Sequence, residues 1–516
     1  MKKMLCLAVV LLASSVARTQ APASLPPAVV SELKVLEETY VLLDQVADRV
    51  WPGWTGYREW PFKFEFENGL RILVGHPNPP KEFEPVEGLR IGNSTVAVDR
   101  TRVMALPLNG PFSGGGGLGS FGMNAAGAPV AVINISLRMV KPVDAAKAAE
   151  DGSLTTENKV LIYLHELFHE FQKKFNRTMY GNLMYNPDTE YATWSNVEGI
   201  ALERAYAETD AAAARECVKD FLVARALKRR SMTDQQRNQE SSDDFMEGTA
   251  NYVMVRALEV IKAGGFRPKL TAAEDPGYHG FADVDRMLAQ YRDRLKKAAS
   301  RHEDPKQKCY DYGCFQGLLC ERLIPGWQAR VEKDQFIDAI MSESVPIADS
   351  ERAAIEQRLK KDYPYEAVLA DAAKFIDARD AAWNDLKSRK GRTYILDFKA
   401  ITQYVAGLAD TKEGYRLGLI TMYRSSYPGF KLDDIELSRT TVPAVADQLY
   451  YLKVVDTAPA THKQPYTVVG TKLADGTWAN ATITTPLFTI KAPKVRIRET
   501  ATRVKIQVLA RVGGKT

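Results

Sequence analysis

Two histidines four residues apart constrain this chain more than any other feature of its sequence. Residues 153–176 read SLTTENKVLIYLHELFHEFQKKFN, and within them His165-Glu166-Leu167-Phe168-His169 follows the pattern His-Glu-x-x-His. On a helix, side chains at this spacing project from one face about one turn apart. Two imidazoles so placed can occupy two corners of a tetrahedral Zn²⁺ site. Glu166 directly follows the first histidine, where its carboxylate can reach a metal-bound water and act as general base.

The residues around this pattern predict a helix. Thr155 and Thr156 suit its N-cap, and Glu157 suits the positive end of the helix dipole. Apolar residues recur at intervals of three and four, which predicts a buried stripe. The alternative interpretation is a core helix whose histidines are satisfied by carbonyls or carboxylates. Because the chain contains only 6 histidines, finding two of them at this spacing favours a metal.

A catalytic zinc needs a third protein ligand, with one coordination position left for water. No histidine follows at a short spacing, so a glutamate on a later helix is expected, and Glu190, Glu198 and Glu247 are candidates. Glu198 and Glu247 each begin the pattern Glu-Gly-x-Ala, whose small residues would let their helix approach the histidine helix closely. The sequence favours Glu247 and leaves Glu198 as the alternative. The glutamate that is not a ligand would then orient a ligand histidine.

His165-Glu-Leu-Phe-His169 followed by Glu247-Gly-Thr-Ala-Asn-Tyr252 resembles the gluzincin metallopeptidases, the group of thermolysin-like and aminopeptidase-N-like enzymes. The chain also resembles an uncharacterised exported bacterial branch with the same two patterns. The resemblance covers about residues 160 to 330. It implies that His165, His169 and Glu247 bind zinc, that Glu166 is the base and that the substrate is a peptide or protein. The chain departs from the aminopeptidase-N-like pattern in the longer separation of its second histidine and Glu247.

Such an enzyme also needs a hydrogen-bond donor for the oxyanion that forms during catalysis. Tyr310 and Tyr252 are the candidates, and His279 is a weaker one. The alternative for each tyrosine is packing in the core.

Composition sets the class of protein and its compartment. A chain of 516 residues with 45% hydrophobic and 26% charged residues is typical of a globular protein with two or three domains. Its formal charge of +5 is small, so no nucleic-acid partner is expected. Lys2-Lys3, the apolar residues 4–13 and Ser15-Val16-Ala17 are typical of a signal peptide, predicted as residues 1–21. We therefore expect export to the periplasm or medium, with no integral membrane segment in the mature chain.

Export changes how the remaining cysteines are interpreted. Cys309 and Cys314 bracket four residues and would close a small disulfide loop in an oxidising compartment. Cys217 and Cys320 are expected to be buried thiols or a second pair.

The predicted fold class is α+β, with a zincin-like, mainly helical catalytic domain (151–390) between an N-terminal β-rich region (22–150) and a C-terminal β-domain (391–516). The pattern predicts a helix over 28–50 and a hairpin over 62–74 with a turn at Asn68-Gly69. Further strands are predicted at 90–106 and 130–140, with Gly114–Gly117 as a loop between them. The C-terminal strands are predicted at 415–423, 448–455, 466–469, 494–498 and 503–508.

The function that the sequence favours is an exported zinc-dependent metallopeptidase. The alternative is a non-proteolytic protein on a zincin scaffold that binds a protein or glycan partner through its β-domains. Metal-dependent hydrolysis of a non-peptide bond would use the same residues.

Overall fold

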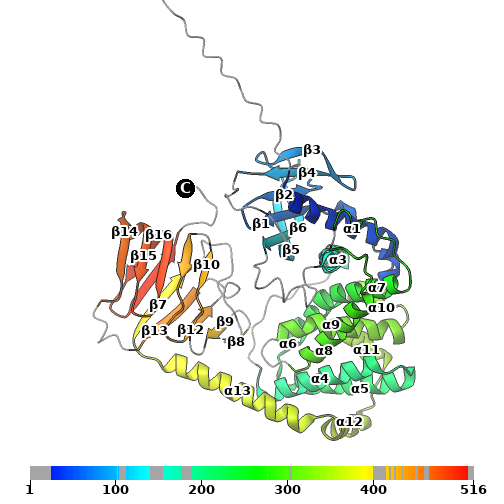
Figure 1. Ribbon diagram of the computed structural model, residues 1–516. Coiled ribbons are helices and arrows are strands. Elements are labelled where there is room, and N and C mark those ends of the chain that lie inside the picture. The colour runs from blue at the N-terminus through cyan, green and yellow to red at the C-terminus, as the bar shows by residue number, and fades with distance from the viewer. Residues whose placement is uncertain are drawn as a thin grey trace, which may run out of the picture.

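The computed structural model combines helices and strands in separate stretches of the chain, so the predicted α+β class is confirmed (Figure 1). It describes residues 25–101, 103, 108, 112–139, 155–175, 187–275, 277–300, 305–398, 414–417, 420–423, 426–432, 434–447, 451–457 and 464–509. The predicted signal peptide lies outside these residues. Within them, no helix has both the length and the apolarity to cross a bilayer.

A six-stranded sheet forms the N-terminal part together with helix α1 (Pro27–Val50), which confirms the helix predicted there. The sheet has the strand order β3-β4-β2-β1-β6-β5. The predicted hairpin is confirmed, because Phe62 pairs with Val74 and the Leu70 N–H donates to Asn68 Oδ1 at 3.0 Å across the turn. The elements are β1 (Phe62–Phe66), β2 (Arg71–Val74), β3 (Glu84–Ile91), β4 (Ser94–Asp99), β5 (Phe112–Met123), β6 (Pro129–Met139) and the short 3₁₀ helix η1 (Tyr57–Glu59).

The alternation of residues in β1 packs the sheet against the histidine helix. Phe62, Phe64 and Phe66 are all buried, whereas the residues between them are not. The rings of Phe62 and Phe64 each lie 6.0 Å from that of Tyr163, which belongs to helix α3 (Thr156–Gln172). The sheet therefore fixes the position of α3.

Two predictions within this sheet are wrong. Residues 90–106 do not form one strand; β3 and β4 form a hairpin there, and its turn uses Gly92 at φ +56°. The loop predicted at Gly114–Gly117 is instead the middle of β5, which pairs antiparallel with β6 from Phe112 opposite Met139 onward. Glycine has little intrinsic preference for strands, so backbone pairing with β6 is what makes this segment a strand.

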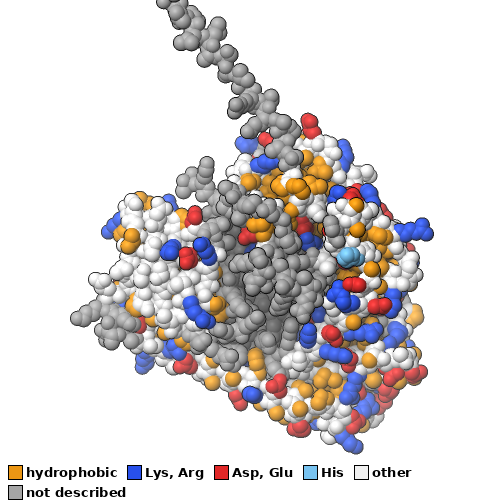
Figure 2. All heavy atoms as spheres, viewed as in Figure 1, with side chains coloured by type: hydrophobic (Ala, Val, Ile, Leu, Met, Phe, Trp, Pro, Cys, Tyr) orange, Lys and Arg blue, Asp and Glu red, His pale blue; other side chains and the backbone are white. Residues whose placement is uncertain are grey.

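Among the described residues, the helical part begins at residue 156 and ends at residue 388. The helical part shares one buried core with α1 and the N-terminal sheet. The residues of this core lie between Leu25 and Tyr363 in the sequence. Charged side chains of both signs are interspersed over the visible face of this part (Figure 2). The elements after α3 are η2 (Lys173–Phe175), α4 (Thr189–Ala207), α5 (Ala211–Lys228), η3 (Arg229–Ser231), α6 (Asp234–Asp243), η4 (Asp244–Gly248), α7 (Thr249–Lys262), α8 (Val284–Ala298), α9 (Pro305–Leu323), α10 (Trp327–Glu332), α11 (Ile337–Ser344), α12 (Asp349–Asp362) and α13 (Tyr365–Ser388).

The predicted disulfide is wrong, because the four cysteines among the described residues are free thiols. Cys309 and Cys314 both belong to helix α9, where a separation of five residues corresponds to about 7.5 Å along the axis. A disulfide needs Cα atoms closer than about 7 Å and Cβ atoms that face each other. Cys309, Cys314 and Cys320 are buried, and Cys217 is half-buried.

The C-terminal part is a β-domain with its own core, and the long helix α13 leads into it (Figure 1). The predicted final hairpin is confirmed, because Val495 pairs with Val508. Within 415–423, predicted as one strand, the structure has two strands instead, β8 and β9, which pair antiparallel. The strands are β7 (Arg392–Asp397), β8 (Gly414–Leu417), β9 (Ile420–Tyr423), β10 (Phe430–Leu432), β11 (Ile435–Leu437), β12 (Ala444–Asp447), β13 (Tyr451–Asp456), β14 (Thr467–Lys472), β15 (Thr477–Thr484), β16 (Thr489–Glu499) and β17 (Arg503–Val508).

Candidate metal centre

Helix α3 begins where the sequence predicts and presents its two histidines to the protein interior. The Thr155 side chain caps the helix by accepting a hydrogen bond from the Asn158 N–H at 3.3 Å, and Glu157 lies in the first turn. His165 and His169 are buried on successive turns, with ring centroids 4.6 Å apart and ring planes at 90°.

Glu247 comes from a different part of the chain, the π-helical turn η4 between α6 and α7. A π-helical turn inserts an extra residue into a helix, and such turns are frequent at functional sites. The first residue of this turn, Asp244, is buried and accepts hydrogen bonds from Arg225 at 2.6 Å and Gln316 at 2.9 Å. These contacts fix the turn that carries Glu247.

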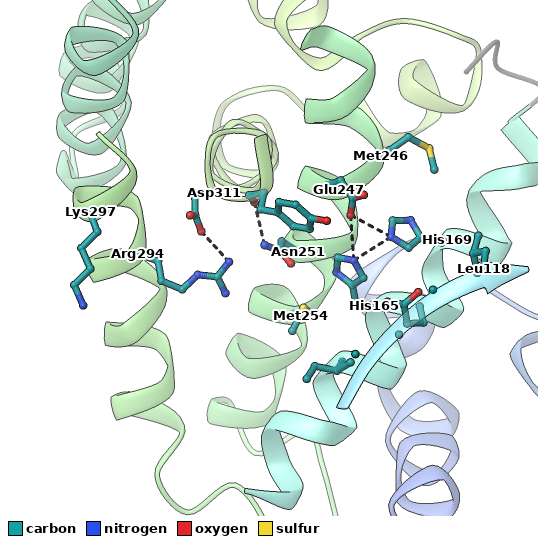
Figure 3. A pocket seen from close by; sticks show the side chains of 16 residues that line it. Leu118, His165, His169, Met246, Glu247, Asn251, Met254, Arg294, Lys297 and Asp311 are labelled. Carbon is teal, nitrogen blue, oxygen red and sulfur yellow. Dashed lines mark hydrogen bonds and ion pairs between the residues drawn. The ribbon is translucent and has the colours of Figure 1, made fainter. Parts of the chain in front are cut away.

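The structure brings His165, His169 and Glu247 together, and each offers one ligand atom within 4.8 Å of the others. The Nε2 atoms of His165 and His169 are 3.0 Å apart (Figure 3). Glu247 Oε2 lies 3.5 Å from Nε2 of His165 and 3.4 Å from Nε2 of His169. Two imidazoles and one carboxylate form a donor set that suits catalytic zinc.

The hydrogen bonds behind His169 show which of its two ring nitrogens faces the other donors. The Thr249 hydroxyl donates to the Phe245 carbonyl at 2.7 Å, so its oxygen accepts from Gln172 Nε2 at 2.6 Å. This fixes the Gln172 amide with Oε1 toward His169 Nδ1, at 2.7 Å. His169 Nδ1 therefore donates to Gln172, and Nε2 is the nitrogen that faces His165 and Glu247.

Sequence reasoning missed two residues that support the donors. Gln172 follows His169 by three residues on the same helix, and this spacing was the signal that could have identified it. Asn251 hydrogen bonds to His165 and also donates to the Tyr310 carbonyl at 3.1 Å. It follows Glu247 by four residues, which is again one helical turn.

Burial is the largest influence on the titratable groups of the centre. It lowers the pKa of His165 to about 4 and raises the pKa of Glu166 to about 7. Burial also acts to lower the pKa of His169, but the hydrogen bond and charge of Glu247 outweigh it and leave that pKa raised. For Glu247 burial acts to raise the pKa, and the two imidazoles outweigh it in the other direction. Near neutral pH, His165 is thus neutral and Glu247 is an anion, the forms in which they bind a metal.

One cavity of about 650 Å³ gives access to the three donors. Glu166 and Tyr310, the two residues predicted to act in catalysis, both line it. The Tyr310 ring is stacked on that of His165 at 6.2 Å, and its hydroxyl hydrogen bonds to Glu247. Burial and the Glu247 charge raise the pKa of Tyr310, so its hydroxyl remains a hydrogen-bond donor.

Strand β5 passes directly over Glu166. A Cβ atom on Gly116 would overlap Glu166 Cγ and lie 2.5 Å from its Oε1, so a larger residue here would have to displace the Glu166 side chain or the strand. At Gly115, by contrast, an added Cβ would meet nothing within 4 Å. The glycines of β5 therefore form the cavity wall above the predicted base.

Glu198, the alternative candidate for the third ligand, does not belong to the metal cluster, so this alternative is wrong. It is fully buried in α4, where its carboxylate accepts a hydrogen bond from Arg225 at 2.7 Å and also contacts Lys228. It belongs to neither the metal cluster nor the shell around the histidines, so the predicted role of orienting a histidine is wrong as well. Glu190 lies exposed in the first turn of α4.

The other two candidate oxyanion donors lie away from the cavity. The Tyr252 hydroxyl donates to Glu321 Oε2 at 3.2 Å within the core. His279 is exposed, and its backbone N–H donates to Glu157.

The Glu-Gly-x-Ala pattern has a packing role, but its partner differs from the one expected. Gly248 approaches helix α9 rather than the histidine helix, and a Cβ on it would overlap Gly313 Cα and lie 2.7 Å from the Gly313 carbonyl carbon. A Cβ on Gly313 would in turn overlap the Asp244 carbonyl oxygen. Two glycines thus allow η4 and α9 to cross at backbone contact.

We expect Gly248→Ala to destabilise the fold by about 1–3 kcal/mol, because the backbones of η4 and α9 must separate. The same shift moves Glu247, so the affinity for zinc should fall as well. Thermal unfolding and zinc titration measure the two effects. Gly313→Ala enters the same contact from α9 and should behave alike; unchanged stability and affinity in both variants would contradict this packing.

Comparison of the chain with protein-family models, curated proteins and solved structures finds no match. The geometry of the centre is therefore the basis for assigning a function.

Proposed function

We propose that this chain is an exported zinc-dependent peptidase of the zincin type, with zinc held by His165, His169 and Glu247. One observation carries the proposal: the three donors, a buried carboxylate outside the donor set and a strand edge line a single cavity. The N-terminal sheet packed on the histidine helix, with the third donor on a later helix, supports the zincin-like arrangement. The leader-like residues 1–21 support export.

Strand β5 supplies a surface on which an extended peptide can pair. Among the described residues β5 pairs only with β6, and the other edge of its backbone, beside the cavity, has no described strand as a partner. An extended peptide can add to such an edge as a further strand, held by main-chain hydrogen bonds. The absence of side chains at Gly115, Gly116 and Gly117 lets the peptide backbone approach closely.

In the proposed reaction Glu166 moves the protons. A bound zinc ion would supply Lewis acidity to the scissile carbonyl and to the attacking water. Glu166 accepts a proton from that water while the water oxygen forms a bond to the carbonyl carbon. It then delivers the proton to the amine that leaves when the C–N bond breaks. The Tyr310 hydroxyl, beside His165, donates a hydrogen bond to the oxyanion that forms in between.

Gly116→Ala is expected to lower kcat/KM by about 100-fold, because the new methyl group must displace either Glu166 or the strand above it. Gly115→Ala is the matched control, since it makes the same change one residue away in open space, and it should retain activity within a few-fold. Steady-state kinetics on one peptide, with zinc content measured in parallel, compare the two. Equal activities would show that β5 does not position the base.

Incubation of the purified, zinc-loaded chain with a mixture of peptides tests the proposed function. We expect new amino and carboxyl termini in the mass spectrum, loss of cleavage with a chelator and recovery on addition of zinc. Zinc binding without cleavage of any peptide would instead favour the non-proteolytic scaffold that binds a partner through its β-domains.

A further inference from the structure

The cavity has a basic wall on the side away from the metal donors. Arg294 and Lys297 both line the cavity and lie three residues apart on α8, so they share one face of that helix. In Figure 3 they lie across the cavity from His165, with Asn251 between Arg294 and that histidine. Neither basic residue has a part in the reaction proposed above.

Arg294 is held in place by contacts that leave part of its side chain exposed. It pairs with Asp311 Oδ1 at 3.1 Å and lies over the ring of Tyr291 at 5.0 Å, with 44% of its side chain exposed. A guanidinium has five N–H donors, and this pair does not use all of them. Asp311 follows Tyr310 directly, so the position of Arg294 is tied to the residue stacked on His165.

The charge of this wall suits a single carboxylate. Asp311, with only 10% of its side chain exposed, offsets one of the two basic groups. Lys297 forms no ion pair with any residue that the structure describes. One net positive charge matches a monoanion and is too little for a polyanion such as a nucleic-acid backbone.

We propose that the cavity selects peptides that present a carboxylate to Arg294 and Lys297 while the neighbouring peptide bond lies at the metal centre. This inference rests on the proposed function, because it takes the ligand to be a peptide. The carboxylate belongs either to an Asp or Glu side chain or to the C-terminus of the peptide. Guanidinium and ammonium groups bind both through charge-assisted hydrogen bonds.

Peptide binding to the metal-free, full-length chain tests this selection without any turnover. Fluorescence anisotropy at low ionic strength would compare three classes of labelled peptide of one length. The first class is a neutral peptide with an amidated C-terminus, and the second is the same amidated peptide with one glutamate placed at each position in turn. The third is the neutral peptide with a free C-terminal carboxylate. We expect one of the two carboxylate classes to bind about tenfold more tightly than the neutral amide. The class that binds more tightly shows whether a side chain or the C-terminus supplies the carboxylate. Added salt should reduce the difference in affinity between that class and the neutral amide.

Substitutions in the wall should remove that advantage selectively. We expect more equal affinities for the three peptide classes in Lys297→Gln, and also in the double variant Arg294→Gln with Asp311→Asn. Lys297→Glu should instead bind a lysine-containing peptide more tightly. Lys296→Gln is the matched control, because Lys296 faces Glu203 at 3.8 Å and lines a different cavity. It should keep the wild-type preference.

Equal binding of all peptides by the wild-type chain, or a preference unchanged in the wall variants, would overturn the inference. Zinc content and cleavage of the neutral peptide are measured separately, so the two proposals can fail independently. Carboxylate-dependent binding without cleavage would support the wall and contradict the peptidase. Cleavage without any carboxylate preference would support the peptidase and contradict the wall.

Discussion

Glu166→Gln is expected to lower kcat by about 10²- to 10⁴-fold while zinc content stays at the wild-type level. The substitution keeps the shape of a buried side chain that lines the cavity, and it removes only the carboxylate that accepts the proton. Glu166 is not among the three clustered donors, so metal binding should not depend on its charge. Steady-state kinetics on a cleaved peptide, with elemental analysis of the same sample, measure both effects.

Glu170→Gln provides the control for this variant. Glu170 is a fully buried carboxylate one turn later on α3, and it pairs with Lys173 at 2.7 Å rather than lining the cavity. Its substitution should change kcat by no more than a few-fold. Loss of zinc in Glu166→Gln, or an unchanged kcat, would contradict the role of Glu166 as base.

Arg225→Met is expected to have the largest effect on stability, a loss of about 3–5 kcal/mol in the free energy of unfolding. Arg225 is 3% exposed and donates hydrogen bonds to three carboxylates, those of Glu198 at 2.7 Å, Asp244 at 2.6 Å and Asp338 at 3.1 Å. Removing its charge leaves these groups buried with too few partners. Because Asp244 begins the turn that carries Glu247, zinc affinity should fall as well.

Urea unfolding of the metal-free chain, followed by zinc titration, measures both consequences. Arg230→Met is the matched control, since Arg230 is 63% exposed and, among the described residues, pairs only with Glu356 at 3.4 Å. It should stay within about 0.5 kcal/mol of wild type. Arg225→Lys keeps a charge but loses the planar fork, so we expect an intermediate result. Wild-type stability in Arg225→Met would show that the buried network contributes little.

Those parts of the site that depend on local sequence could be predicted. The start of α3 follows from the Thr155 cap and the Glu157 charge, which act within one turn, and the spacing of its histidines puts both rings on one face. The fuller pattern at Glu247, with apolar residues before it and Tyr252 after it, favours this residue as the third ligand, and the structure brings it to the histidines.

What could not be predicted depends on distant partners. Glu198 has the same short pattern as Glu247, and only Arg225, 27 positions later, shows why it is buried elsewhere. The glycines of β5 indicated a loop because their strand state comes from pairing with β6. The disulfide prediction took the residues between Cys309 and Cys314 for a loop, whereas packing makes them part of α9.

Elemental analysis of the purified chain tests whether His165, His169 and Glu247 hold one zinc ion. We predict about one zinc per wild-type chain, none in His165→Ala or Glu247→Ala, and the wild-type content in Glu190→Ala, which removes an exposed glutamate. A folded wild-type chain that contains no zinc and cannot be loaded with it would show that these three residues do not form a zinc site.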